Sequence, residues 1–155
     1  MSDRATLQVV MAEDDDGHAT LVRRNLKRAG VERDPVHLKD GQEVLDYVYR
    51  RGSWANRPSH EALALLLDLN MPRLGGFDVL RQLRADAAVT PIPVFVFTTT
   101  DNPHEIHRCY TLGAAACLVK PVDYGRFGDM VQRLAGFLLT VRLPGEPAAP
   151  RPHGS

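Results

Sequence analysis

The feature that most constrains the fold is an alternation of short apolar runs with longer segments of helical periodicity. Three continuous apolar runs stand out: Leu7 to Ala12, Ala62 to Leu67 and Ile92 to Phe97. A fourth, Ala114 to Val119, is similar, and a weaker one near Pro35 to Leu38 fits a strand at or near an edge. Runs without polar alternation are typical of strands buried on both faces of a parallel sheet.

Helical patterns occupy the segments between these runs. The apolar positions at helical spacing are Val22, Leu26 and Ala29; Val44, Leu45 and Val48; Phe77, Leu80 and Leu83; and Phe127, Val131, Leu134, Leu138 and Val141. Residues 103 to 112 form a further, poorly patterned helix, and Gly30 is a helix stop. Strands alternating with helices predict an α/β protein of three α/β/α layers. Right-handed crossovers favour a doubly wound, flavodoxin-like sheet of five parallel strands.

Polar residues follow the predicted strands at the end where such folds bind ligands. Glu13 and Asp14 follow the first strand, Asp68 the third, Thr98 the fourth and Lys120 the fifth. Because the carboxyl ends of parallel strands share one edge, we expect these side chains to converge in one crevice. One of the adjacent acids, Asp15 or Asp16, is expected to cap the first helix.

Three carboxylates in one crevice repel one another unless a cation joins them. Glu13, Asp14 and Asp68, with a backbone carbonyl and waters, form an oxygen donor set suited to Mg²⁺. Lys120 can contact a phosphate oxygen and Thr98 offers a hydroxyl. This combination favours in-line transfer of a phosphoryl group to a carboxylate.

From about Leu7 to Phe137 the chain resembles the receiver domains of two-component response regulators. The shared motifs are Ala12-Glu13-Asp14-Asp15, Leu67-Asp68-Leu69-Asn70-Met71-Pro72 with Gly75-Gly76-Phe77, Thr98-Thr99 and Lys120-Pro121. The resemblance implies that Asp68 is the phosphoacceptor, and that Glu13, Asp14, Asp68 and the Asn70 carbonyl hold Mg²⁺. It also implies that Thr98 is the switch hydroxyl, that Lys120 binds the phosphoryl group, and that the Lys120–Pro121 bond is cis.

Within this family the chain is most similar to the single-domain regulators that partner bacterial phytochromes. The similarity lies in the long segment from Tyr49 to Pro58, in Lys120-Pro121-Val122-Asp123 and in a last helix that continues into Thr140 to Pro144. It implies a phytochrome-like sensor histidine kinase as phosphodonor. Cys117 stands where many receivers carry the Tyr or Phe whose ring turns inward on phosphorylation, so the resemblance does not extend to output through that ring.

Composition excludes several other classes. The 19 basic and 19 acidic residues give no basic excess of the kind that nucleic-acid binders carry. The sequence contains neither a signal core nor a membrane span, so we expect a cytoplasmic protein whose two cysteines are reduced. Residues 1–143 are interpreted as the receiver domain, and residues 144–155 as a disordered, Pro-rich tail.

We expect no output domain after the receiver, and therefore expect output through a partner or through self-association. The last helix carries Met130, Phe137 and Leu139 besides its main apolar stripe, which suggests a homodimer face; the competing interpretation is a buried terminal helix. The basic face of the first helix (Arg23, Arg24, Lys27 and Arg28) suits kinase docking or simply solvent. Trp54 either packs over a helix or meets a partner.

Three other functions are compatible with a parallel sheet that carries an aspartate at a strand end. A phosphohydrolase of the haloacid-dehalogenase kind needs an acid two residues after its nucleophile, where this chain has Asn70, so we expect a signalling protein and not an enzyme. A mononucleotide-binding module would place phosphate against Glu13 to Asp16, which would repel it. A degenerate receiver that acts only as a scaffold remains open.

Overall fold

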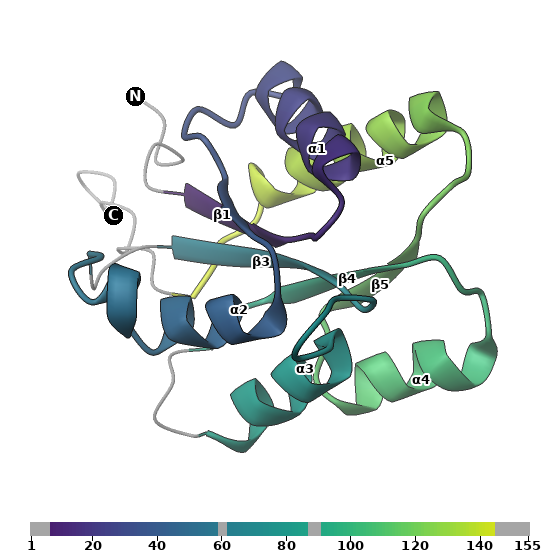
Figure 1. Ribbon diagram of the computed structural model, residues 1–155. Helices are drawn as coiled ribbons and strands as arrows, with labels where there is room; N and C mark the ends of the chain where they lie inside the picture. Colours follow the sequence, from purple (N-terminus) through teal and green to yellow (C-terminus); the bar gives the residue numbers. More distant parts are fainter. Residues whose placement is uncertain (1–6, 59–61, 87–90, 145–155) are drawn as a thin grey trace, which may run out of the picture.

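The computed structural model describes residues 7–58, 62–86 and 91–144, which form one open α/β sheet with helices on both faces (Figure 1). The elements in chain order are β1 (Leu7–Ala12), α1 (Asp16–Arg28), β2 (Val36–Leu38), α2 (Gly41–Val48), the 3₁₀ helix η2 (Gly52–Trp54), β3 (Ala62–Asp68), α3 (Gly76–Ala85), β4 (Val94–Thr98), α4 (Pro103–Thr111), β5 (Ala116–Val119) and α5 (Tyr124–Leu138). All strand pairs are parallel, in the order β2-β1-β3-β4-β5. The predicted flavodoxin-like fold is confirmed.

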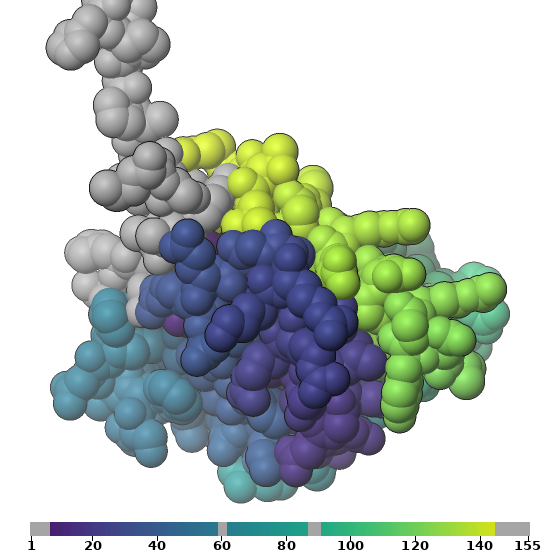
Figure 2. All heavy atoms as spheres, turned by 90° about the horizontal axis from the view of Figure 1, so that it is seen from above, coloured from purple at the N-terminus to yellow at the C-terminus, as the bar shows by residue number. Residues whose placement is uncertain are grey.

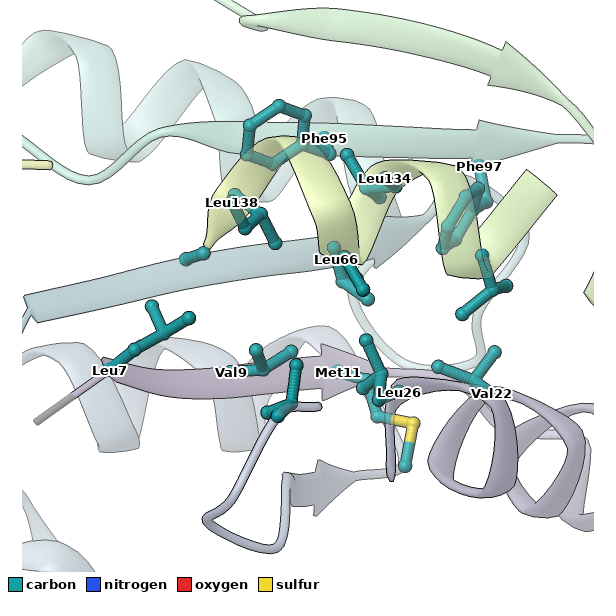
Figure 3. Packing of buried hydrophobic residues seen from close by; sticks show 14 of the residues in the cluster. Leu7, Val9, Met11, Val22, Leu26, Leu66, Phe95, Phe97, Leu134 and Leu138 are labelled. Carbon is teal, nitrogen blue, oxygen red and sulfur yellow. The ribbon is translucent and has the colours of Figure 1, made fainter. Parts of the chain in front are cut away.

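Side chains alternate between the two faces along each central strand, which explains why the strands are apolar throughout. In β1, Val9 and Met11 point to the layer formed by α1 and α5, whereas Val10 joins the core beneath α2, α3 and α4. Phe95 and Phe97 of β4 reach the α1/α5 layer, where they lie near Leu134 and Leu138 of α5 (Figure 3). Both faces therefore need apolar side chains, and no polar alternation can arise.

Helix starts follow local capping chemistry. Asp15 is the N-cap of α1 and accepts the backbone N–H of His18, as one of the two sequence alternatives predicted. Asp40, Asn102 and Asp123 cap α2, α4 and α5 in the same way. Gly30 ends α1 with a φ of +105°, a conformation that glycine adopts without strain.

The two last strands differ from their predicted extent. β4 begins at Val94 and not at Ile92, because Pro93 has no N–H to donate to a ladder. β5 begins at Ala116, and its residues are half-buried or exposed, since β5 is an edge strand with one neighbour. Its apolar run had suggested a strand as deeply buried as β1 and β3.

The last helix is shorter than its apolar stripe suggested. α5 ends at Leu138, so Val141 lies beyond it, although Leu143 still packs on the core. Met130 and Leu139, which the sequence offered as surplus apolar residues, also pack against the core. Of the three surplus apolar residues, only Phe137 is exposed. The predicted dimer face of α5 therefore keeps one of its three residues.

Trp54 packs edge-on against Tyr47 of α2, with 4.9 Å between ring centroids, which decides between its two interpretations in favour of packing over a helix. The predicted tail falls outside the described residues, apart from Pro144. Among the helices of the described part of the chain, none combines the length and apolar character that a membrane-spanning helix requires.

Candidate functional site

The sheet order brings three carboxylates together at the carboxyl ends of adjacent strands. Glu13 and Asp14 follow β1, and Asp68 is the last residue of β3, the direct neighbour of β1. One oxygen from each of the three residues lies within 4.8 Å of the others. Glu13 and Asp68 are buried, whereas Asp14 is exposed and opens the cluster to solvent.

Lys120 supplies the positive charge in this cluster. It follows β5, and its Nζ donates to Glu13 Oε1 and to Asp68 Oδ2, both at 2.7 Å. The Lys120–Pro121 bond is trans, as are all described peptide bonds, so the cis bond implied by the family resemblance was wrong. The trans form is the intrinsically favoured one for an X–Pro bond, and it already lets the ammonium reach both carboxylates.

Burial and charge act against each other at Glu13 and Lys120. Burial, which has the largest effect, and nearby Asp68 together raise the pKa of Glu13 to about 7 against the lowering effect of Lys120. At Lys120 burial lowers the pKa, but the hydrogen bonds and charges of Asp68 and Glu13 outweigh burial, so the pKa is raised. Lys120 is therefore charged throughout the physiological range.

Asp68 is held in place by the turn that follows it. The backbone N–H of Asn70 donates to Asp68 Oδ1 at 2.8 Å, which leaves Oδ2 to Lys120. Gly76 at the start of α3 passes so close that an added Cβ would lie 2.9 Å from the Asp68 carbonyl oxygen. Gly76 thus allows α3 to begin directly against the phosphoacceptor candidate.

Thr98 is buried at the end of β4, and the structure ties it to its neighbours through the backbone. Its Oγ1 accepts the N–H of Thr100 at 3.1 Å, and its carbonyl accepts the N–H of Lys120 at 2.7 Å. The loop after β4 and the residue that contacts both carboxylates are therefore linked through Thr98.

Sequence reasoning missed two histidines at the site. His18 Nδ1 lies 3.3 Å from Lys120 Nζ and 3.7 Å from Glu13 Oε1. His37 of β2 lies with Nε2 2.6 Å from the Glu13 carbonyl, where it can only donate. The signal for His18 was its place three residues after the capping Asp15; no pattern in the sequence indicated His37.

The donor set fits a small, hard divalent cation. Three carboxylates face one buried ammonium, so the cluster carries excess negative charge, and its ligand atoms are oxygens. Asp14 is exposed, which leaves room for the waters that Mg²⁺ retains in proteins. Zn²⁺ prefers cysteine sulfur and imidazole nitrogen as ligands, and this group of ligand atoms contains neither.

A cluster of acids, a lysine and a threonine at the carboxyl edge of a 2-1-3-4-5 sheet is typical of one class of signalling domain. The sequence pattern of the response regulator receiver domain matches residues 9–132, and the chain therefore belongs to that family. Receiver domains bind Mg²⁺ at an acidic site and partner with sensor histidine kinases. They are signalling proteins and are generally not enzymes.

The similar proteins include regulators associated with phytochromes. Response regulator Rcp1 from a Synechocystis species is 30% identical over 88% of this chain and 92% of its own length. The structure of its Mn²⁺-bound form matches with a TM-score of 0.81, covering 88% of this chain and 98% of that one.

Two further similar structures are of regulators in light signalling. RPA3017 of R. palustris, described in red light signalling, is 33% identical with a TM-score of 0.79, over 92% of this chain and 99% of its own. The phosphorylated cyanobacterial phytochrome response regulator RcpA is 27% identical with a TM-score of 0.80, over 88% of this chain and 96% of its own.

Proposed function

We propose that this receiver accepts a phosphoryl group from a histidine kinase onto Asp68. The observation that carries the proposal is the environment of Asp68: a buried carboxylate with Lys120 on one oxygen and the Asn70 N–H on the other. The P–N bond of a phosphohistidine breaks, its imidazole leaves, and a carboxylate oxygen forms the new P–O bond.

The remaining site residues have the following proposed roles. Glu13, Asp14, Asp68 and the backbone carbonyl of Asn70 hold Mg²⁺, which neutralises negative charge on the transferring group. Lys120 donates to a phosphoryl oxygen. Thr98 exchanges its bond to the Thr100 N–H for one to the phosphoryl group, which moves the loop after β4 and so alters α4, β5 and α5.

The first test is intact-mass measurement after incubation with acetyl phosphate and Mg²⁺. We expect one phosphoryl adduct on the wild-type chain. Asp68→Asn should show no adduct because the nucleophilic oxygen is replaced by an amide, and EDTA should prevent labelling of the wild type. Asp129→Asn, the same change at an exposed position of α5, is the matched control and should label normally. An unlabelled wild type would favour the phosphorylation-independent scaffold.

The kinase is proposed to dock over α1 and α5. These helices lie side by side on one face of the molecule (Figure 2), and a groove of about 430 Å³ runs between them. Arg24 and Arg28 of the basic α1 face line this groove together with Gly17 and Tyr124, which adjoin His18 at the site. The similarity to Rcp1, RcpA and RPA3017 supports a phytochrome-like kinase as the partner.

Reversing the charge of two groove arginines distinguishes kinase docking from the phosphorylation reaction itself. Arg24→Glu with Arg28→Glu should slow phosphotransfer from an autophosphorylated bacterial phytochrome kinase, yet leave labelling by acetyl phosphate unchanged. Arg133→Glu, an exposed change on α5 outside the groove lining, is the control. Equal rates of kinase transfer in the wild type and the double variant would rule out this docking surface.

We further propose that phosphorylation promotes a homodimer through α4, β5 and α5. Tyr110, Val119 and Phe137 are large apolar side chains exposed on these three elements. Multi-angle light scattering with Mg²⁺ and beryllofluoride, a phosphoryl mimic, should give a dimer that Phe137→Ser weakens. Val122→Ser, at an exposed position between β5 and α5 and far along the chain from Phe137, should have no effect. A monomer under all conditions would exclude the dimer.

We also propose that the protein is located in the cytoplasm, where thiols stay reduced, because Cys109 and Cys117 are free cysteines.

A further inference from the structure

The ammonium of Lys120 has three N–H donors, and the protein provides three acceptors. Two are Glu13 Oε1 and Asp68 Oδ2, and the third is His18 Nδ1 at 3.3 Å. The Lys120 side chain is only 4% exposed, so water contributes little to its solvation. Each donor of a buried ammonium needs a partner, because an unsatisfied one costs free energy.

The His18 ring is fixed on several sides, so that Nδ1 faces the ammonium. Its backbone N–H donates to the capping Asp15, which sets the first turn of α1. The imidazole stands edge-on to Tyr124 and to Phe127 of α5, with centroid distances of 6.0 and 5.6 Å. Because an ammonium can only donate, Nδ1 must be the acceptor and the ring proton sits on Nε2.

We propose that His18 is a positioning residue for phosphotransfer: its Nδ1 anchors Lys120 while another ammonium N–H passes from Asp68 Oδ2 to the incoming phosphoryl group. This inference rests on the proposed role of Lys120. Both carboxylate partners of Lys120 change during the reaction, because Asp68 becomes an acyl phosphate and Glu13 is a proposed ligand of Mg²⁺. Of the three acceptors of Lys120, only His18 neither takes the phosphoryl group nor binds Mg²⁺ in the proposed reaction. His18 can therefore keep the ammonium in place throughout.

Two substitutions separate this role from simple packing between α1 and α5. His18→Leu keeps an apolar body beside Tyr124 and Phe127 but removes the acceptor. His18→Asn loses ring contact but can place its amide oxygen where Nδ1 was, one bond from Cγ. A packing role predicts that Leu is tolerated and Asn is not, whereas the positioning role predicts the reverse.

The experiment is the rate of labelling by acetyl phosphate at saturating Mg²⁺, followed by intact mass, alongside thermal melts. We expect His18→Leu to lower the rate roughly three- to tenfold, as the loss of one hydrogen bond would. His18→Asn should recover most of this loss. His107→Leu, the same change at an exposed position of α4, should have no effect. A wild-type rate for His18→Leu, or a slow rate for both His18 variants, would overturn the inference.

A second readout tests the hydrogen bond without any phosphoryl transfer. In ¹⁵N spectra of the imidazole, His18 should show the Nε2–H tautomer, and Lys120→Met should shift its Nδ1 resonance. An unchanged resonance would overturn the inference while the proposed function still stood. A wild-type chain that took no label from acetyl phosphate would overturn the proposed function and this inference together.

Discussion

The absence of a side chain at Gly76 lets the backbone pack closely around Asp68. An added Cβ at Gly76 would lie 2.8 Å from Leu69 Cα and 2.9 Å from the Asp68 carbonyl oxygen, and backbone atoms cannot move aside cheaply. Gly76→Ala should therefore lower the free energy of unfolding by roughly 1–3 kcal/mol, the usual cost of overpacking. It should also slow labelling, because relief of the clash displaces Asp68. Urea denaturation and the acetyl phosphate assay measure the two effects.

Gly136 is the matched control for Gly76. It lies inside α5, and an added Cβ there would meet no other atom within 4 Å. Gly136→Ala should stabilise the protein by roughly 0.5–1 kcal/mol, because alanine favours the helix over glycine. Equal effects of the two substitutions would show that the contact at Gly76 does not limit packing at the site.

Burial at Cys109 leads to a pH-dependent prediction. Burial, aided by the neighbouring Cys117, raises the pKa of the Cys109 thiol from 9.0 to about 12. Below about pH 9 the thiol is protonated in both states; above it the unfolded chain loses the proton first, so stability falls as pH rises toward 12. Denaturation at about pH 8 and about pH 10 should show a larger loss for the wild type than for Cys109→Ala. Equal losses would contradict the shift.

At the scale of elements, the packing of α1 on α5 includes a polar link within an apolar layer. Gln132 Nε2 donates to Asn25 Oδ1 at 2.7 Å, and Asn25 Nδ2 donates to the Leu21 carbonyl. Asn25 is buried, and it lies where any side chain at Gly128 would collide with it. The small residue on one helix and the amide on the other therefore set the distance between α1 and α5.

Removing one partner of this link should destabilise the helix pair. Gln132→Met keeps the length of the side chain but leaves Asn25 Oδ1 buried without its donor, which should cost roughly 1–3 kcal/mol. Chemical denaturation measures this loss, and the exposed Arg133→Met is the control. A Gln132→Met variant as stable as the control would mean that water replaces the donor.

At the scale of the whole molecule, charge is balanced overall but not locally. The chain has 19 basic and 19 acidic residues, yet three carboxylates gather around one ammonium at the sheet edge. Mg²⁺ should raise the melting temperature of the wild type, with about 2.7 kcal/mol of added stability at a hundredfold excess over Kd. Asp14→Asn should raise the melting temperature without metal and reduce the gain from Mg²⁺. Asp129→Asn should match the wild type, and an undiminished gain in Asp14→Asn would remove Asp14 from the proposed metal site.

The local chemistry of the sequence was sufficient for most of the fold and for the list of reactive residues. Strands buried on both faces must be apolar throughout, and caps such as Asp15 and stops such as Gly30 act over a few residues, so both can be recognised in the chain. Polar and charged residues that directly follow apolar strands stand out in the sequence, and parallel strands bring such residues to one edge of the sheet. Glu13, Asp14, Asp68, Thr98 and Lys120 were therefore predicted as site candidates before any contact was known.

Contacts between distant segments were decided only by the tertiary structure. His18 and His37 reach the site because α1 and β2 pack beside it. Each is a single residue outside any repeating sequence pattern, so the sequence alone did not predict its place at the site. The partial exposure of β5 follows from its place at the edge of the sheet. Local preference determined which elements form and which chemistry they carry. Long-range packing determined which side chains meet, because their separation depends on the whole chain and not on neighbours in sequence.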